Sequence, residues 1–461
     1  MVFLGDEGRD VLIVKRMIVD NKFTLLGPIT SVGSMYMGPI YYYFMIPFLA
    51  LFGLSPVGPA IMVALFAVAT VFLIYYLLHK YFSFHAAIFA SLLYALSPLT
   101  IHYGRSSWNP NLVPFFSTLI ILGLLKTIIE KKPRWLFIIG PSFGVCLQLH
   151  YVSLLLLPVI IACLAIIKFK VNFKYYFASF IGFIISYSPF LVFEVRHQFT
   201  NTKAVINFLS QTRSVTTGIG NTYEVIIDVL VRLFWRLVVV TNAEITKIFM
   251  LCLFLFLSIL FFKLKNKTNK LFLTVIFIWF IIGIVSFGIY KGIIYDYYFV
   301  PLFSIPFILT SIFLDKIWQM KKIGKIASIS IFSLLIFFQI EGSPLKLPPN
   351  NLLKNTKDIS QFVFDEVHGQ KYNFALIATH NSDHAYRYFL EIWGNPPQVI
   401  ENPDNDPERK TPTTQLYVVC EEKICKPLGH PLWEIAGFGP AVITNEWKVS
   451  TARIFRLEHY K

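Results

Sequence analysis

The sequence has few charged residues, and fewer of them are acidic than basic. Charged side chains make up 15% of the 461 residues, 26 acidic and 41 basic, whereas 56% of the residues are hydrophobic. Soluble globular proteins carry about 25% charged residues, and the mean hydropathy here is +0.62. This composition excludes a soluble globular protein and indicates an integral membrane protein, mostly α-helical.

Long stretches of the chain lack charge almost completely. Ten of them run for about 16 to 22 residues, enough for a helix to cross roughly 30 Å of hydrocarbon. Only the short polar segment 148–151 separates the fourth stretch from the fifth, so this pair is the least distinct. The ten predicted spans cover 57–78, 85–101, 112–129, 135–149, 152–167, 175–193, 244–262, 271–289, 298–314 and 323–340.

The net charge of +15 would suggest a nucleic-acid partner in a soluble protein, but the position of the lysines argues against one here. Alternate short loops between the predicted spans hold fifteen basic residues and only two acids. The intervening short loops hold only Arg105 and Lys291 as basic residues. By the positive-inside rule the lysine-rich loops face the cytoplasm. Residues 1–56, the loop 194–243 and the tail after 341 are then external.

The first residues lack the features of a secretory leader. Met1 to Gly5 has no basic region and no apolar stretch of about 7 to 15 residues. Because an external N-terminus has to be carried across the membrane, we expect a further transmembrane helix ahead of Met1 and eleven spans in all.

Cysteine is rare, with five residues in the chain. Three lie within predicted spans, where a thiol behaves as a small apolar group. The other two, Cys420 and Cys425, lie in the external tail. An oxidising exterior would allow them to form a disulfide, although two free thiols remain the alternative.

The external segments show their own patterns. Residues 6–21 are typical of an amphipathic helix, and 39–52 of an apolar, aromatic helix that lies along the outer interface. Within 222–241, four charges recur at every fourth residue, which predicts the solvated face of an interfacial helix. They are Glu224, Asp228, Arg232 and Arg236.

Beyond residue 341 the composition becomes ordinary in polarity. We divide the chain into a membrane domain, 1–341, and a small external α/β domain, 342–461. The latter is expected to contain helices at 352–368 and 383–393. Its strands are expected at 373–379, 415–420, 439–448 and 452–458.

The predicted spans hold almost no charged side chain, and no internal repeat is visible, which argues against a secondary transporter. Polar and aromatic residues instead cluster at helix ends on the predicted external side. Such a cluster suits an amphiphilic, anionic substrate. The segments concerned are 5–10, 102–111, 148–151, 194–197 and 290–298.

These residue types suggest roles. Asp6 or Glu7 could accept a proton from an acceptor or hold a divalent cation. Phosphate could be neutralised by basic side chains, with arginine binding bidentately. Sugar or lipid could be bound by aromatic and polar side chains. The phosphate candidates are Arg9, Arg105, Arg196, His197 and Lys291, and the substrate candidates are Tyr42, His102, Trp108, Asn109, His150, Tyr295 and Asp296.

Each assignment has a structural alternative. Asp6 and Glu7 suit the first turn of a helix as cap and dipole partners. Arg105 and Lys291 suit anchors at the membrane interface. His150 and His197 suit interfacial hydrogen bonding, and Asn109 with Pro110 suits a turn before a helix.

Several of these segments together resemble one family. Asp6-Glu7-x-Arg9 is similar to the Asp-Glu-x-Arg motif of the polyprenyl-phosphate-sugar-dependent C-type glycosyltransferases of family 39, the protein O-mannosyltransferase and lipid A aminoarabinose transferase group. Gly38-Pro39-Ile-Tyr-Tyr-Tyr43 resembles the family's Pro-Pro-Leu-x-Tyr segment. Further similar segments are Ser97-Pro98 with Arg105, Pro189 to His197, and Tyr295 to Pro301.

The resemblance, which covers about residues 3–315, implies a C-type (GT-C) membrane fold and an inverting glycosyltransferase. It implies that Asp6 is the catalytic carboxylate, that Glu7 supports it and that Arg9 acts at the donor. Gly38 stands where the aminoarabinose transferases have a lysine, and no acid follows Arg105. These two departures leave the sugar and any metal undefined.

We therefore expect a multi-pass protein of the cytoplasmic membrane that transfers a sugar from a polyprenyl-phosphate carrier to a protein or glycolipid acceptor on the outer face. No nucleotide-binding motif is visible, as expected if the donor is lipid-linked. The alternatives are a flippase for lipid-linked sugars and a noncatalytic membrane scaffold.

Overall fold

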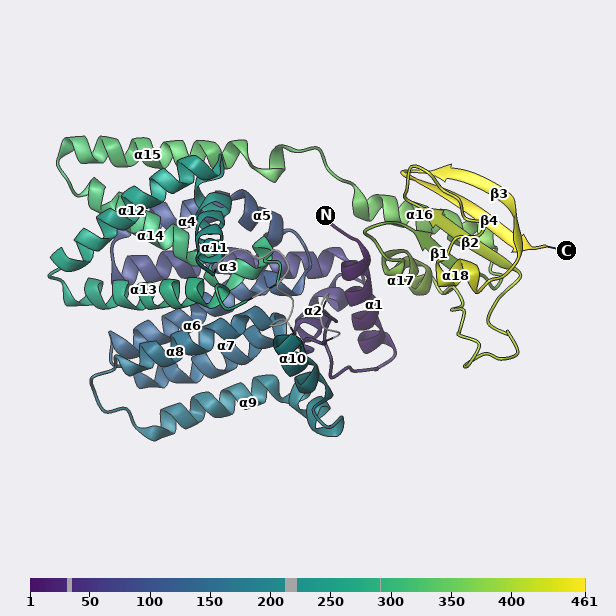
Figure 1. Cartoon of the computed structure of the whole chain (residues 1–461), viewed down its shortest axis with the longest axis horizontal. Helices are drawn as coiled ribbons and strands as arrows, with labels where there is room; N and C mark the ends of the chain where they lie inside the picture. Colours follow the sequence, from purple (N-terminus) through teal and green to yellow (C-terminus); the bar gives the residue numbers. More distant parts are fainter. Residues whose placement is uncertain (31–34, 212–221, 291, 461) are drawn as a thin grey trace. The chain divides into compact units, whose positions relative to one another are not determined.

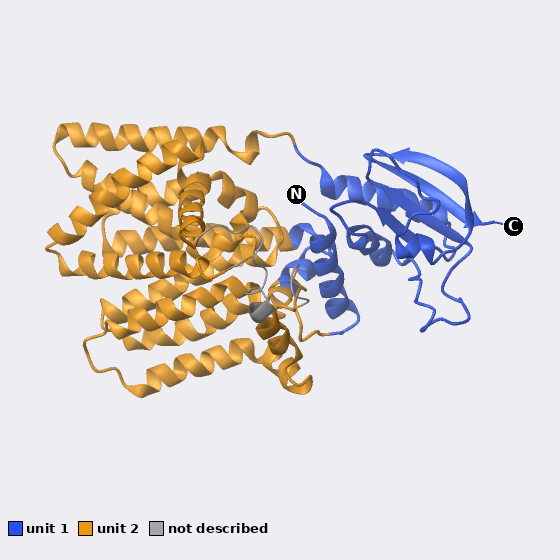
Figure 2. Cartoon of the chain, viewed as in Figure 1, with its two compact units in different colours: residues 1–22, 45–58, 349–461 blue, residues 23–44, 59–348 orange. Residues whose placement is uncertain are grey.

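The structure is a computed structural model that describes residues 1–30, 35–211, 222–290 and 292–460 (Figure 1). Packing divides the chain into two compact units (Figure 2). Unit 1 comprises residues 1–22, 45–58 and 349–461, and unit 2 comprises 23–44 and 59–348. Helix α2 (Ile40–Leu51) begins in unit 2 and ends in unit 1.

Unit 2 is helical, as its composition predicts. Its helices are α3 (Val57–Tyr81), α4 (Phe84–Leu96), α5 (Pro98–Gly104), α6 (Val113–Ile128), α7 (Leu136–Leu149), α8 (Leu156–Ala165), α9 (Phe173–Arg196), α10 (Thr200–Gln211), α11 (Thr222–Phe234), α12 (Ala243–Lys263), α13 (Lys267–Phe287), α14 (Ser304–Trp318) and α15 (Lys322–Glu341). A π-helical turn, η4 (Trp235–Val239), extends α11.

All ten predicted spans coincide with helices. By length and composition, six helices of the described residues can cross a membrane, or eight if two bent pairs each count as one. The pair α4 and α5 bends by 61° at Pro98, and the pair η5 (Asp296–Leu302) and α14 bends by 60°. Helix α7, with 14 residues, and the helix 151–165 are shorter than a full span. Hydropathy detects apolar stretches but not the breaks within them.

Helix α6 lies at the centre of unit 2, with 89% of its apolar window buried, whereas α9 has 6% buried. Small residues allow α7 and α9 to pack closely, because a Cβ at Gly140 would overlap the carbonyl oxygen of Ser179. The exposed apolar face of α9 is therefore available to lipid.

Unit 1 contains the predicted α/β domain. Its elements are α16 (Leu352–Val367), β1 (Asn373–Ile377), α17 (His384–Ile392), β2 (Gln415–Cys420), α18 (Trp433–Ala436), β3 (Ala441–Val449) and β4 (Ala452–His459). The prediction of these helices and strands is confirmed within a few residues, and only the one-turn α18 was not foreseen. Cys420 and Cys425 form a disulfide, so the free-thiol alternative is wrong.

The sheet has the order β1-β2-β4-β3, with β1 and β2 parallel and the other pairs antiparallel. Alternate residues of β1 enter two separate cores. Phe374 and Leu376 pack with α16 and α17, while Ala375 and Ile377 pack with the segment around α18. Because the carboxyl ends of β1 and β2 share one edge, the loops that follow them lie together there.

Helix α1 (Gly5–Val19) belongs to unit 1, where it packs against α17. The approach is close, since a Cβ at Gly8 would overlap the backbone of Ala385. Packing therefore groups residues 1–22 and 45–58 with 349–461, which a division by composition at residue 341 does not anticipate (Figure 2).

Candidate active site

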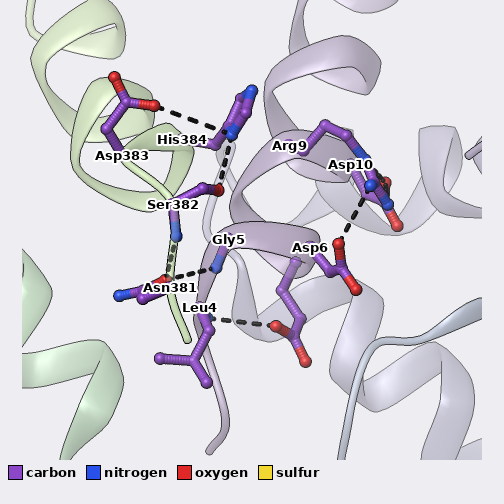
Figure 3. A network of polar contacts seen from close by, with 10 residues as sticks. Leu4, Gly5, Asp6, Arg9, Asp10, Asn381, Ser382, Asp383 and His384 are labelled. Atoms are coloured by element: carbon purple, nitrogen blue, oxygen red, sulfur yellow. Dashed lines mark hydrogen bonds and ion pairs between the residues drawn. The ribbon is translucent and has the colours of Figure 1, made fainter. Parts of the chain in front are cut away.

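Asp6 lies in the first turn of α1 with its side chain 58% exposed. Its Oδ1 accepts a hydrogen bond of 3.0 Å from Nη1 of Arg9, and the two form an ion pair (Figure 3). The carboxylate is thus held on the surface of unit 1 beside a fixed positive charge, a geometry compatible with proton transfer from a substrate.

Glu7 has a different environment from its neighbour. It is 7% exposed, and its Oε2 accepts a hydrogen bond of 3.2 Å from the backbone N–H of Leu4. This contact satisfies an amide at the start of α1, as in a capping box. The capping alternative therefore describes Glu7, whereas Asp6 faces outward.

Asp10 was not among the candidates, yet it completes the charge cluster of α1. It is fully buried, and its Oδ1 accepts hydrogen bonds from Nε and Nη2 of Arg9 at 3.0 and 2.9 Å. Arg9 thereby bridges Asp6 and Asp10 (Figure 3). The four-residue spacing of the two aspartates, which places them on one helix face, was the available signal.

The loop after β1 meets the start of α1. The backbone N–H of Gly5 donates a 2.8 Å hydrogen bond to Oδ1 of Asn381 (Figure 3). Nearby, Ser382 Oγ and His384 Nδ1 are 2.8 Å apart. Burial lowers the pKa of His384; Asp383 opposes this shift and the positive charge of Arg9 adds to it. His384 is therefore neutral near pH 7.

In unit 2, three of the predicted segments come together in an aromatic cluster. Trp108 lies edge-on to Tyr297 with ring centroids 4.6 Å apart. His150 contacts the same Tyr297 at 5.6 Å and Tyr298 at 5.2 Å. Tyr295 stacks on Tyr297 at 5.7 Å. Desolvation lowers the pKa of His150 to about 4, which leaves the imidazole neutral.

Two further substrate candidates are buried structural residues. Asn109 is 5% exposed, and its Nδ2 donates to the carbonyl oxygen of Leu149. Tyr42 is 1% exposed and packs beside Tyr41. The Asn109 bond connects two segments of the aromatic cluster, and neither side chain lies on the surface.

Asp296 is neutralised by α11 and its π-helical extension. Arg236 Nε donates to Oδ2 at 2.8 Å, and Arg232 Nη1 lies 3.4 Å from Oδ1. Arg232 also pairs with Asp228 at 2.8 Å. The predicted solvated face is confirmed for Glu224, Asp228 and Arg236, which are exposed, whereas Arg232 is only 23% exposed. The pattern of one helix could not reveal that Asp296 pairs with both arginines.

Three of the remaining basic candidates, Arg105, Arg196 and His197, are exposed. Arg105 and Arg196 form no ion pair with any carboxylate of the described residues. His197 stacks on Phe193 at 4.1 Å and shares a 2.9 Å hydrogen bond between its Nδ1 and the Phe193 carbonyl oxygen. His102 is exposed and contacts Tyr103 edge-on at 5.4 Å. Lys291 lies outside the described residues.

Glu194, at the end of α9, is not available to a ligand. It is 2% exposed and accepts hydrogen bonds from the backbone N–H groups of Asn201 and Thr202 at 3.2 and 2.8 Å. It caps α10. Within the described ranges, no group of three or more His, Cys, Asp or Glu side chains gathers as a ligand set for a metal ion.

Residues 37–193 match the family model described as dolichyl-phosphate-mannose-protein mannosyltransferase. The crystal structure of ArnT from Cupriavidus metallidurans bound to undecaprenyl phosphate is similar, with a TM-score of 0.67 and 12% identity, over 98% of this chain and 94% of that chain. Its apo form gives a TM-score of 0.64 and 12% identity, over 99% and 93%.

The chain has the fold of the C-type glycosyltransferases. The predicted fold class and the resemblance drawn from the motifs are confirmed. No curated protein sequence gives a significant match.

The two sets of candidates lie in different units of this chain. The family match includes the segments around Pro39, Arg105 and Pro189, whereas Asp6 and Tyr295 lie outside it. Unit 2 brings Trp108, His150 and Tyr295 together. Unit 1 holds Asp6 and Arg9 with Asp10.

Proposed function

We propose that this protein is an inverting glycosyltransferase that uses a polyprenyl-phosphate sugar as donor and acts on the outer face of the cytoplasmic membrane. The single observation that carries the proposal is the environment of Asp6: an exposed carboxylate, ion-paired with Arg9, in the first turn of a helix, next to a glutamate that is engaged in capping. The C-type fold and the mannosyltransferase family match support the same reaction class.

The reaction is a displacement at the anomeric carbon of the sugar. A hydroxyl or amine of the acceptor attacks that carbon, and its proton passes to the Asp6 carboxylate. The bond between the anomeric carbon and the phosphate oxygen breaks, and the electron pair leaves with the polyprenyl phosphate. Asp6 thus acts as general base, a role that contributes about 10²- to 10⁴-fold to a rate.

Departure of the phosphate requires positive charge. We assign this role to Arg105 and Arg196, which are exposed and have no carboxylate partner among the described residues, together with His197. The cluster of Trp108, His150 and Tyr297 offers rings on which a sugar can stack, and the neutral His150 adds a hydrogen-bonding group. ArnT, a protein of the same fold, has been crystallised with undecaprenyl phosphate.

The external location has separate support. The lysine-rich loops place the tail after residue 341 outside, and a disulfide such as Cys420–Cys425 persists in oxidising compartments. The acceptor, protein or glycolipid, is left open, as is a divalent cation.

The test is sugar transfer by the Asp6→Asn variant. Full-length protein in lipid vesicles is supplied with radiolabelled polyprenyl-phosphate sugars and acceptors extracted from native membranes, and labelled product is counted. Asp6→Asn should reduce transfer by about 10²-fold or more, because the amide cannot accept the proton.

Two matched variants accompany it. Asp20→Asn changes the same residue type at the other end of α1, and Glu7→Gln preserves an oxygen for the Leu4 amide. Both should retain most of the transfer activity. Full transfer by Asp6→Asn would show that Asp6 is not the base, and movement of intact lipid-linked sugar without transfer in the unmodified protein would support a flippase.

A further inference from the structure

A chain of hydrogen bonds connects the disulfide loop of unit 1 to the first turn of α1. Glu421 directly follows Cys420, inside the loop that the Cys420–Cys425 disulfide closes. Its Oε1 accepts hydrogen bonds from Nδ2 of Asn381 at 2.9 Å and from the hydroxyl of Tyr386 at 2.5 Å. Asn381 Oδ1 in turn accepts from the backbone N–H of Gly5 at 2.8 Å.

This order of donors and acceptors fixes the orientation of the Asn381 amide. A carboxylate only accepts hydrogen bonds, so Glu421 selects the NH₂ end of the amide. The oxygen end is left to face Gly5 and the backbone N–H of Ser382, which donates to it at 2.9 Å (Figure 3). The amide cannot turn over without losing these contacts.

The contact with Gly5 adds to the cap that Glu7 forms with the backbone of Leu4. The first N–H groups of a helix have no partner within it, and Leu4, which precedes α1, has no side-chain oxygen to supply one. Asn381 supplies the acceptor from another part of unit 1. Since Asp6 directly follows Gly5, this bond holds the backbone from which the Asp6 carboxylate projects.

Close packing makes the position of α1 specific. A Cβ at Gly5 would overlap the side chain of Ser382. At the other end of α1, Glu391 of α17 accepts from Lys15 Nζ at 3.1 Å and from Arg16 Nη2 at 2.9 Å. The helix is thus fixed at both ends to the α/β part of unit 1.

We propose that Asn381 is a positioning residue for Asp6, and that Glu421, in the disulfide-closed loop, holds Asn381 in the required orientation. This inference rests on the proposed function of Asp6. The α/β part of unit 1 is then a component of the catalytic apparatus and not an appended module.

The test exchanges the amide of Asn381 and the carboxylate of Glu421 between the two positions. Asn381→Asp retains the oxygen that faces Gly5 but sets a second carboxylate against Glu421, and like charges in contact repel. The double variant Asn381→Asp with Glu421→Gln restores one donor and one acceptor in reversed order. Asn381→Ala removes the contact without adding charge.

Two quantities are measured on full-length protein in vesicles, with the radiolabelled polyprenyl-phosphate sugars used above. Asn381→Asp should lower kcat at least about tenfold and leave KM for the lipid-linked donor unchanged, because a small displacement of a catalytic group is costly. Hydrogen exchange of the amides of residues 5–9 should rise in parallel. The double variant should recover both quantities, and Asn381→Ala should lower kcat.

Thr379→Ala is the matched control. Thr379 Oγ1 donates to Glu422 at 2.9 Å between the same two loops, but this bond does not lead to α1. The kcat of Thr379→Ala should be unchanged.

The inference is overturned if Asn381→Asp and Asn381→Ala keep wild-type kcat while Asp6→Asn is inactive, or if the folded double variant fails to recover. Activity of Asp6→Asn would instead contradict the proposed function itself.

Discussion

At the scale of residues, neighbouring side chains of one type have different roles because the helix turns them to different surroundings. Asp6 and Glu7 are adjacent acids, yet one is exposed beside Arg9 and the other closes the cap of α1. Consecutive side chains of a helix point about 100° apart, so one meets solvent when the other meets the interior. The sequence motif identifies the two acids as candidates, but it does not show which of them is exposed and which caps the helix.

His384 gives a prediction for pH. Burial lowers its pKa, with Arg9 and Arg387 acting in the same direction and Asp383 and Asp6 opposing. Near and below pH 6.5, His384 binds a proton more readily in the unfolded chain than in the folded chain. The free energy of unfolding therefore falls as the pH falls from 7 to 5. His384→Gln should therefore show a smaller decrease of the unfolding midpoint over this interval.

The measurement is thermal unfolding followed by tryptophan fluorescence at several pH values between 5 and 7. Burial would raise the pKa of Glu391, but hydrogen bonds from Arg16 and Lys15 outweigh it and lower this pKa. Protonation of Glu391 therefore adds little to the pH dependence of stability between pH 5 and 7. Equal slopes for the two proteins would show that His384 does not contribute.

At the scale of elements, helix periodicity and strand alternation predicted what each segment forms but not what it contacts. The strands from β1 to β4 were found because apolar residues alternate or run together between turn residues. The pairing of Arg236 with Asp296 was missed, since the two are 60 residues apart and nothing local connects them. The docking of α1 on α17 was missed for the same reason.

Gly8 tests that docking. Alanine is favoured over glycine within a helix by about 1 kcal/mol, so Gly8→Ala would stabilise an isolated α1. In unit 1, however, the new Cβ would overlap the backbone of Ala385, which cannot move aside as a side chain can. Overpacking costs about 1 to 3 kcal/mol, and we expect net destabilisation with faster hydrogen exchange in α1 and α17.

Val19→Ala, at the exposed end of the same helix, serves as its control and should change the exchange little. If Gly8→Ala proved more stable than the unmodified protein, the contact between α1 and α17 would be looser than described.

At the scale of the whole molecule, composition alone predicts an integral membrane protein, because a chain with so little charge has to place its apolar helices in lipid. Orientation rests on a smaller quantity, the unequal distribution of lysine among short loops. The candidate residues follow from that orientation, because polar groups at helix ends predict a site only on the lysine-poor side of the membrane. Asp10 lies in the polar segment 5–10, but only its spacing from Asp6 points to the charge cluster, and Asn381 does not differ in sequence from an ordinary surface residue.

Orientation can be tested directly with single cysteines. The positive-inside rule places the loop between α12 and α13 in the cytoplasm and the α/β part of unit 1 outside. Lys265 and Asp404 are exposed positions in these two places. In intact cells, a membrane-impermeant maleimide should label Asp404→Cys, whereas Lys265→Cys should react only after permeabilisation. Both variants are built in protein whose Cys252 is replaced, because that native free thiol is exposed. The reverse labelling pattern would place the α/β part of unit 1, and Asp6 with it, in the reducing cytoplasm. The proposed reaction on the outer face would then be wrong.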